Sequence, residues 1–215
     1  MHLMDNKKIL VFSPHADDVE LSMGGTIAKL SKTNDVTIIT CIVPEEGVDG
    51  HKDKYMIENR GKEQIEAAKI LGAKLEILNI GQYDFAYNRK YVKQFDDLIK
   101  AYNPDAVFCC WEHDTHQDHK TLANIIYGAL RKNDRSLYIY DQTTLGGGIN
   151  ANIFKPNLWV DISGEPLELK IKAMEKYKYY IGKHIESIVA RSKFQGGQVG
   201  VSHAECFQVV KQLDL

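Results

Sequence analysis

The chain has 215 residues, of which 44% are hydrophobic and 26% charged, a composition typical of a globular protein with a substantial core. Its 27 Lys and Arg residues nearly balance its 29 Asp and Glu residues, which argues against nucleic acid as a main partner. No apolar run approaches the roughly 18 residues that span a bilayer, and the polar start is unlike a signal peptide. We therefore expect one globular domain over residues 1–215, with no transmembrane segment.

The cysteines form no C-x-x-C pair, and most of them lie in apolar, strand-like runs. We expect the three in these runs to be reduced and buried, which favours a cytoplasmic location. The four residues are Cys41, Cys109, Cys110 and Cys206. The sequence leaves the oligomeric state open, a homo-oligomer included.

Apolar, β-branched runs alternate with amphipathic stretches along most of the chain. The apolar runs predict strands at residues 8–12, 35–43, 75–80, 106–111, 137–140, 158–162 and 204–210. The amphipathic stretches predict helices at residues 19–30, 57–71, 89–102, 118–130 and 165–181, with a further helical piece before residue 196. This alternation favours an α/β fold: a single Rossmann-like domain with a mostly parallel sheet and helices on both faces.

Two glycines interrupt the first predicted helix. Gly24 and Gly25 each lower the local helix propensity by roughly 1 kcal/mol. Glycines at such positions indicate that another segment packs very close to the helix. Gly72, in contrast, follows the helix predicted at 57–71 and occupies the position at which glycine commonly ends a helix.

Side chains with metal-ligand chemistry follow the first and the fourth predicted strands. Residues 15–18 read His-Ala-Asp-Asp, and residues 116–119 read His-Gln-Asp-His. In open α/β sheets, ligands bind beyond the carboxyl ends of the strands, at the point where the strand order reverses. In the Rossmann-like order this point lies between strands one and four. The sequence therefore predicts a metal site beyond the carboxyl ends of these two strands.

A catalytic zinc site commonly takes three protein ligands from His, Asp and Glu and leaves a position for water. His15 and Asp18 can supply two ligands, and one histidine of the later cluster can supply the third. Asp17 would then lie beside the metal, where a general base for the water belongs. The other histidine could stabilise an oxyanion or protonate a leaving amine, and Asp118 could fix its tautomer.

Other enzyme classes fit these residues less well. The place of a G-x-G-x-x-G motif after the first strand is taken by the first cluster, and neither a P-loop nor a G-x-S-x-G elbow is present. Paired aspartates could hold magnesium for phosphoryl transfer, but imidazole favours zinc or a transition metal. A hydrolase of another kind of amide, and a non-catalytic binding protein on the same scaffold, stay open as alternatives.

The two motifs resemble those of the LmbE-like (PIG-L) family of zinc-dependent deacetylases of N-acetylated sugars. In that family the motifs are usually written H-P-D-D and H-P-D-H. This chain replaces the proline in both and keeps every side chain with metal or acid-base chemistry. Residues 23–28 (Met-Gly-Gly-Thr-Ile-Ala) match the family's first helix, and residues 204–207 (Ala-Glu-Cys-Phe) resemble its A-E-A-F segment. The resemblance therefore extends over nearly the whole chain.

The resemblance implies a metal-dependent hydrolase that removes the acetyl group from an N-acetylglucosaminyl-type sugar or sugar conjugate, a small-molecule substrate. It implies that His15, Asp18 and His119 bind zinc, with ferrous iron as the alternative metal. Asp17 is the implied general base.

The resemblance also assigns roles around the metal. It makes His116 the oxyanion or acid group and Asp118 the residue that orients it. Arg60, on the helix predicted at 57–71, is the implied contact to substrate hydroxyls. Glu46 and Asp84, in the loops after the second and third predicted strands, are further implied substrate contacts.

Overall fold

The strands form one mixed sheet in the computed structural model, which describes residues 4–43, 54–132, 134–142, 153–178 and 181–213. Among these residues the sheet has seven strands in the order β3-β2-β1-β4-β5-β7-β6. The neighbours from β3 to β5 pair in parallel, whereas β7 runs antiparallel to β5 and β6. The strands are β1 (Lys8–Ser13), β2 (Asp35–Val43), β3 (Lys74–Gly81), β4 (Ala106–Cys110), β5 (Ser136–Tyr140), β6 (Leu158–Asp161) and β7 (Ala204–Lys211).

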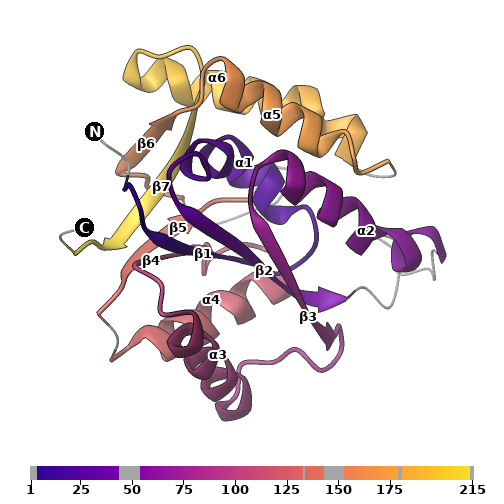
Figure 1. Ribbon diagram of the computed structural model, residues 1–215, viewed down its shortest axis with the longest axis vertical. Coiled ribbons are helices and arrows are strands. Elements are labelled where there is room, and N and C mark those ends of the chain that lie inside the picture. The colour runs from indigo at the N-terminus through magenta and orange to yellow at the C-terminus, as the bar shows by residue number, and fades with distance from the viewer. Residues whose placement is uncertain (1–3, 44–53, 133, 143–152, 179–180, 214–215) are drawn as a thin grey trace.

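Helices cover both faces of the sheet, as predicted. In Figure 1, α1, α2, α5 and α6 lie above the sheet, and α3 and α4 lie below it. The helices are α1 (Asp18–Leu30), α2 (Lys54–Ile70), α3 (Arg89–Tyr102), α4 (Gln117–Leu130), α5 (Glu165–Met174) and α6 (Ile185–Val199), with a short 3₁₀ helix at Ile181–His184. The Rossmann-like α/β fold is therefore confirmed, with β1 and β4 as direct neighbours.

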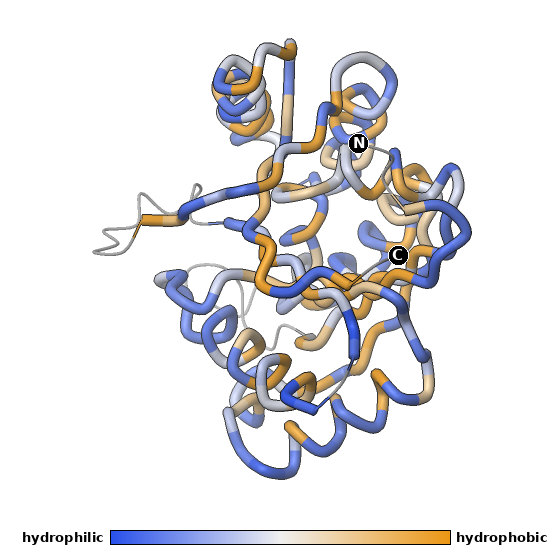
Figure 2. Tube along the Cα trace, turned by 90° about the vertical axis from the view of Figure 1, so that its left-hand side faces the viewer, coloured by the Kyte–Doolittle hydropathy of each residue, from blue (hydrophilic) through white to orange (hydrophobic). Residues whose placement is uncertain are grey.

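The burial of each element follows its place in the sheet. Every residue of the central strands β4 and β5 is buried, while the edge strand β3 is mostly half-buried. The colouring in Figure 2 alternates between blue and orange along the helices that cover the sheet, the pattern of helices with one apolar face. This pattern explains why periodicity predicted most of the elements to within a few residues.

Two helices differ from the prediction. The helix expected at 165–181 ends at Met174, and α6 continues through Gly196 and Gly197 to Val199. A Cβ atom on Gly196 would lie 2.7 Å from the Val201 carbonyl oxygen and 2.8 Å from the His203 backbone. The glycine is therefore required by the close return of the chain toward β7, and it does not end the helix.

The glycines of α1 also serve close packing, as predicted. A Cβ atom on Gly25 would lie 2.9 Å from three side-chain atoms of Ile162, and one on Gly24 would lie 3.2 Å from the Lys170 Cγ atom. At Met23, just before them, the backbone leaves helical geometry (φ −142°, ψ 21°). The amide groups released by this kink donate to the Glu205 carboxylate, from Gly25 at 3.1 Å and from Thr26 at 2.6 Å.

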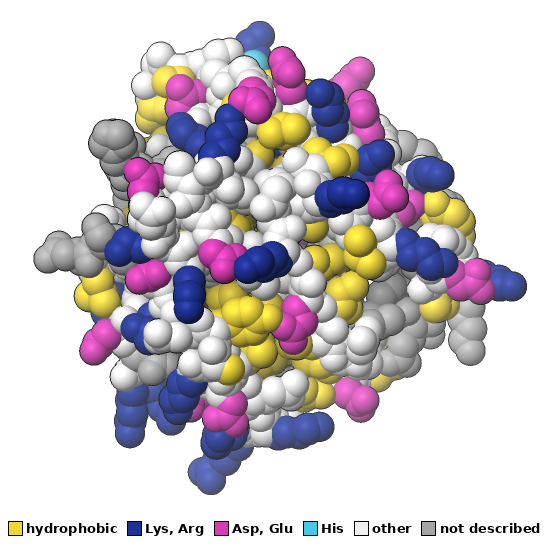
Figure 3. Space-filling model, viewed as in Figure 1, with side chains coloured by type: hydrophobic (Ala, Val, Ile, Leu, Met, Phe, Trp, Pro, Cys, Tyr) yellow, Lys and Arg dark blue, Asp and Glu magenta, His cyan; other side chains and the backbone are white. Residues whose placement is uncertain are grey.

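The surface carries both signs of charge. Figure 3 shows Lys and Arg interspersed with Asp and Glu over one whole face, which agrees with the near balance of charges in the sequence. Within the described residues no helix is both long enough and apolar enough to cross a membrane.

Candidate metal centre

The turn between β1 and α1 holds the first cluster in an uncommon backbone conformation. Asp17 occupies the N-cap position of α1 with φ 110°, in the left-handed region, yet its side chain makes no capping hydrogen bond. Asp18 instead accepts a hydrogen bond from the His15 backbone N–H at 2.8 Å. A non-glycine residue held at positive φ costs energy and is commonly found at functional sites. The turn is therefore more than a helix cap.

The turn between β4 and α4 holds the second cluster. Asp114 accepts the backbone N–H of His116 at 2.8 Å through its Oδ1 atom. His116 is the N-cap of α4, and its Nδ1 atom accepts the backbone N–H of Asp118 at 3.2 Å. Local hydrogen bonds thus fix the direction of both side chains at the start of this helix.

The two turns meet at the Asp18 carboxylate. Its Oδ2 atom lies 3.2 Å from His15 Nδ1 and 3.4 Å from His119 Nε2. Ligand atoms on a tetrahedral zinc ion, with bonds of about 2.0–2.1 Å, lie about 3.4 Å apart. The separations of the two imidazole nitrogens from Asp18 Oδ2 are therefore of the size expected around a tetrahedral metal ion. His15, Asp18 and His119 are the three residues that the sequence predicted as ligands.

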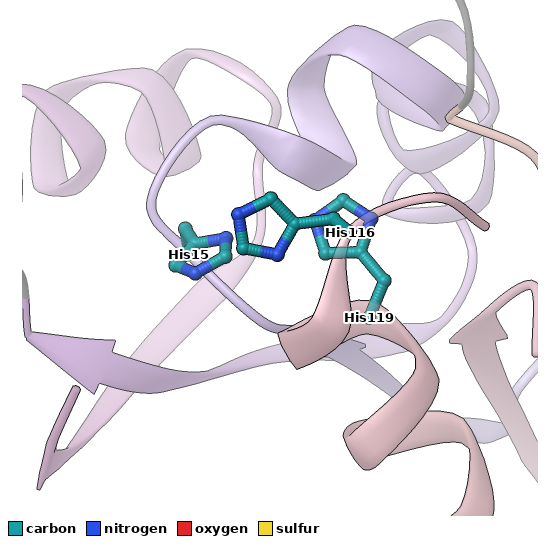
Figure 4. A group of neighbouring side chains, drawn as sticks. All are labelled: His15, His116 and His119. Atoms are coloured by element: carbon teal, nitrogen blue, oxygen red, sulfur yellow. The ribbon is translucent and has the colours of Figure 1, made fainter. Parts of the chain in front are cut away.

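His116 lies against this group. Figure 4 shows the three imidazoles side by side, with His15 from the turn after β1 and both others from the start of α4. One ring nitrogen from each of His15, His116 and His119 lies within 4.8 Å of the others. His116 is the most accessible, with 49% of its side chain exposed against 22% for His15 and 7% for His119. Of the three imidazoles, His116 is therefore the one most open to solvent.

Carboxylates orient both predicted imidazole ligands. Asp114 Oδ2 lies 2.9 Å from His119 Nδ1, which leaves Nε2 directed at Asp18. Asp118 Oδ2 lies 2.9 Å from His15 Nε2 and 3.8 Å from His116 Nδ1. Carboxylates that hold the second nitrogen of a metal-binding histidine are common partners in such sites.

Asp118 contacts both neighbouring imidazoles. Its carboxylate lies beside His15 Nε2, and its backbone N–H donates to His116 Nδ1. The second contact follows from the helix start, because the His116 ring accepts a backbone N–H that α4 leaves without an intrahelical partner. The role of Asp118 in orienting His116 during a reaction stays a prediction. Asp114 has an orienting role that the sequence did not predict, although it stands only five residues before His119.

The pKa values of Asp18 and of the neighbouring histidines depend on one another. Burial alone would raise the pKa of Asp18, but the charges and hydrogen bonds of His119 and His15 hold it well below its ordinary value. Burial opposes protonation of His119 as well, yet Asp18 and Asp114 raise its pKa well above the ordinary value. Burial and the neighbouring His15 and His119 lower the pKa of His116. Asp18 is therefore an ionised carboxylate, as a metal ligand must be.

Arg60 reaches the first turn from α2. Its Nε atom donates to the Ala16 carbonyl at 2.9 Å, and its guanidinium forms an ion pair with Asp17. Both side chains are largely buried. The pair engages the Asp17 carboxylate, which makes no capping bond, and gives the predicted general base a fixed direction.

The other predicted substrate contacts are less defined. Asp84 is exposed in the loop after β3, where its backbone N–H donates to the Gly81 carbonyl at 3.0 Å. Within the described part of the chain, its side chain makes no hydrogen bond to the metal-site residues. Glu46 lies outside the described residues. The roles of Arg60, Asp84 and Glu46 toward a substrate stay predictions.

Known proteins with similar sequences or folds include deacetylases. The chain is 28% identical over 193 residues to the diacetylchitobiose deacetylase of Thermococcus kodakarensis, a match that covers 81% of this chain and 70% of the relative. The structure of the N,N'-diacetylchitobiose deacetylase from Pyrococcus horikoshii superposes with a TM-score of 0.77 at 25% identity, covering 96% of this chain and 84% of the other. These two archaeal proteins resemble this chain over most of its length.

The same fold also occurs in a protein with another activity. A 4-carboxy-2-hydroxymuconate hydratase from Pseudomonas putida superposes with a TM-score of 0.76 at 18% identity, covering 97% of this chain and 98% of the other. This likeness shows the fold alone, so the chemistry has to be argued from side chains. Residues 10–130, more than half of the chain and the part that carries both clusters, match the PIG-L family, described as GlcNAc-PI de-N-acetylase. The chain therefore belongs to the PIG-L family.

Proposed function

We propose that this protein is a zinc-dependent N-deacetylase that removes the acetyl group from an N-acetylglucosaminyl-type sugar or sugar conjugate. The observation that carries the proposal is that His15 Nδ1 and His119 Nε2 both lie close to Asp18 Oδ2, with the His116 ring against His15. The archaeal relatives are named for deacetylation of a chitobiose, which supports the acetamido group as the reacting part.

His15, Asp18 and His119 would hold the metal. Two imidazoles and a carboxylate suit zinc, and ferrous iron accepts the same ligands. A bound divalent ion would polarise the acetyl carbonyl and lower the pKa of a water molecule. The remaining steps fall to side chains of this chain.

Asp17 is the general base in this proposal. It accepts a proton from the attacking water, and that proton is then available to the leaving amine. The ion pair with Arg60 holds the Asp17 carboxylate in place, and that carboxylate makes no capping bond at the start of α1. An Asp17 engaged in capping would not be available for this role.

His116 stabilises the oxyanion. Its Nδ1 atom accepts a hydrogen bond from the Asp118 backbone, so the neutral ring carries its proton on Nε2. A lowered pKa favours this neutral form. The Nε2–H is then a fixed donor for the charge that develops on the acetyl oxygen.

The compartment of the proposed enzyme is the cytoplasm. All four cysteines are free thiols and buried, as expected for a protein in a reducing environment. A homo-oligomer stays a prediction.

The test combines metal content with amine release. Protein purified without added metal is analysed for zinc and iron, and amine and acetate release are measured on N-acetylglucosamine, diacetylchitobiose and N-acetylglucosaminyl conjugates. We expect about one metal ion per chain, loss of turnover with a chelator, and recovery with zinc. If only non-sugar amides are hydrolysed, the substrate is another amide and the proposed sugar substrate is wrong. Bound metal without any hydrolysis would refute the proposed deacetylase activity.

A further inference from the structure

The two oxygens of the Asp18 carboxylate have different surroundings. Oδ2 faces His15 Nδ1 and His119 Nε2, the predicted metal position. Oδ1 accepts a hydrogen bond from the side-chain amide of Gln142. Oδ2 also accepts the backbone N–H of His15 at 2.8 Å. A carboxylate can bind a metal ion through one oxygen or through both, and hydrogen bonds to its two oxygens fix how the carboxylate is turned toward the ion.

Gln142 is held by the end of β5. This strand lies beside β4 in the sheet, so its carboxyl end opens on the same edge as the metal centre. The preceding residue, Asp141, forms an ion pair with Arg191 of α6 at 2.6 Å, and its carbonyl accepts a second bond from that guanidinium at 3.2 Å. The backbone at Gln142 is thereby tied to α6, which limits where its side chain can reach.

The amide of Gln142 has one defined orientation. Its nitrogen has to face Asp18, because an ionised carboxylate accepts hydrogen bonds and cannot donate one. Its Oε1 atom is buried and has no partner among the described residues. Gln142 also lines a small cavity with Lys170, Arg191 and Ser192, which has room for about one water molecule that could satisfy this oxygen.

We propose that Gln142 is a positioning residue that holds Asp18 Oδ1 and thereby keeps Oδ2 turned toward His15 Nδ1 and His119 Nε2, where the metal ion would bind. The inference rests on the metal site of the proposed function and is independent of the substrate. Hydrogen-bond partners of metal ligands commonly contribute 10- to 100-fold to metal affinity. Gln142 matches no family motif quoted from the sequence, and its place is apparent only once β5 lies beside β4.

The experiment measures zinc affinity. Gln142→Leu keeps most of the side-chain volume and removes the donor. We expect its affinity for Zn²⁺, measured by competition with a chromophoric chelator, to fall 10- to 100-fold. Gln198→Leu is the matched control, because this glutamine is exposed near the end of α6, and it should bind Zn²⁺ as the unmodified protein does. Circular dichroism checks that both variants are folded.

A second pair of variants separates positioning from a general loss of structure. In an Asp18→Ala background the proposed partner is absent, so adding Gln142→Leu should change zinc affinity less than threefold. An equal drop in both backgrounds, or zinc affinity within threefold of the unmodified protein in the single variant, overturns the proposal. Protein that binds zinc as expected without deacetylating any substrate would refute the proposed function and leave the role of Gln142 standing.

Discussion

Two buried charged clusters are built on α1, and they balance their charges differently. At the kink of α1, the Glu205 carboxylate accepts two backbone amides and pairs with Lys170 Nζ at 2.5 Å, with both side chains almost fully buried. At the start of the same helix, carboxylates and imidazoles converge on Asp18. The first cluster is complete within the protein, because each charge has its opposite.

The second cluster balances most of its carboxylates with imidazoles, whose charge depends on a proton. Four carboxylates, from Asp17, Asp18, Asp114 and Asp118, are buried there; the guanidinium of Arg60 pairs with one of them, and the other three face His15 or His119. Buried charges are costly unless they are paired or bind a metal. The difference teaches that burial of charge does not by itself mark a functional site. Carboxylates held by imidazoles, which can exchange their protons for a metal ion, are the more informative sign.

The largest expected effect comes from the general base. Asp17→Asn keeps the shape and the oxygen that Arg60 contacts, but an amide cannot accept the proton of water. We expect turnover to fall by about 10² to 10⁴, while zinc content and melting temperature stay near those of the unmodified protein. Steady-state kinetics and metal analysis on the same preparation measure both. Loss of zinc in this variant would mean that Asp17 and Asp18 have exchanged roles.

Breaking the ion pair between Lys170 and Glu205 should have the opposite effect, with a loss of stability and little change in turnover. Lys170→Met leaves the Glu205 carboxylate buried without its counter-charge, which costs about 3–5 kcal/mol of unfolding free energy. Turnover per folded molecule should change less than tenfold, because Lys170 touches no predicted ligand. Chemical denaturation measures the first effect and active-site titration with kinetics the second.

Lys32→Met is the matched control for this prediction. Lys32 pairs with Glu165 at 2.5 Å, but 48% and 64% of the two side chains are exposed. Such a pair contributes at most about 1 kcal/mol. If Lys170→Met lowers the unfolding free energy no more than Lys32→Met does, the buried ion pair does not have the stabilising role assigned to it.

His116→Ala tests whether His116 is an oxyanion donor or a metal ligand. Removing a donor to an oxyanion costs about 10²- to 10³-fold in turnover, with zinc retained. His116→Asn preserves a capping oxygen for α4 and distinguishes the loss of the cap from the loss of the donor. If zinc is lost in both variants, the ligand set consists of the three neighbouring imidazoles, and His116 is a ligand.

The metal centre was predictable from the sequence because its proposed ligands lie next to regular secondary-structure elements. His15 and Asp18 directly follow β1, and His119 lies in the first turn of α4, so periodicity and strand order were enough to bring them together. The kink at Met23 had no such signal. Its amides are satisfied by Glu205, 180 residues along the chain from Gly25, and no local pattern reports a partner so distant.

The contacts that orient the proposed ligands also could not be predicted from local sequence patterns. Asp118 and the two imidazoles have several nearby acceptors and donors, and only atomic distances decide which pair forms. Gln142 follows the fifth strand, and its contact with Asp18 depends on the ion pair between Asp141 and Arg191. Sequence patterns therefore brought the proposed ligands together, while the residues that hold them became apparent only from the fold.

A third buried charge on α1 belongs to neither cluster. Glu20 is fully buried, and neither oxygen has a hydrogen bond that meets normal geometry among the described residues. Burial raises its pKa to about 7, and the nearby Tyr177 hydroxyl and Gln64 amide oppose this shift only partly. Burial of the Glu20 carboxylate therefore destabilises the folded state when it is ionised, because Glu20 lacks a counter-charge like the one that Lys170 gives to Glu205.

The smallest expected effect follows from Glu20 and depends on pH. Below pH 4.5 the carboxyl is protonated in both the folded and the unfolded chain. As pH rises toward 7, the unfolded chain loses the proton first, so the folded state loses up to about 3 kcal/mol of stability. Glu20→Gln lacks this loss. Its stability advantage over the unmodified protein, measured by denaturation in a chelator, should grow from pH 4.5 to 7 and then level off. Glu168→Gln, at an exposed site on α5, controls for the substitution itself. An advantage that is constant with pH would show that Glu20 finds a partner that keeps it charged, and α1 would then carry a third balanced site.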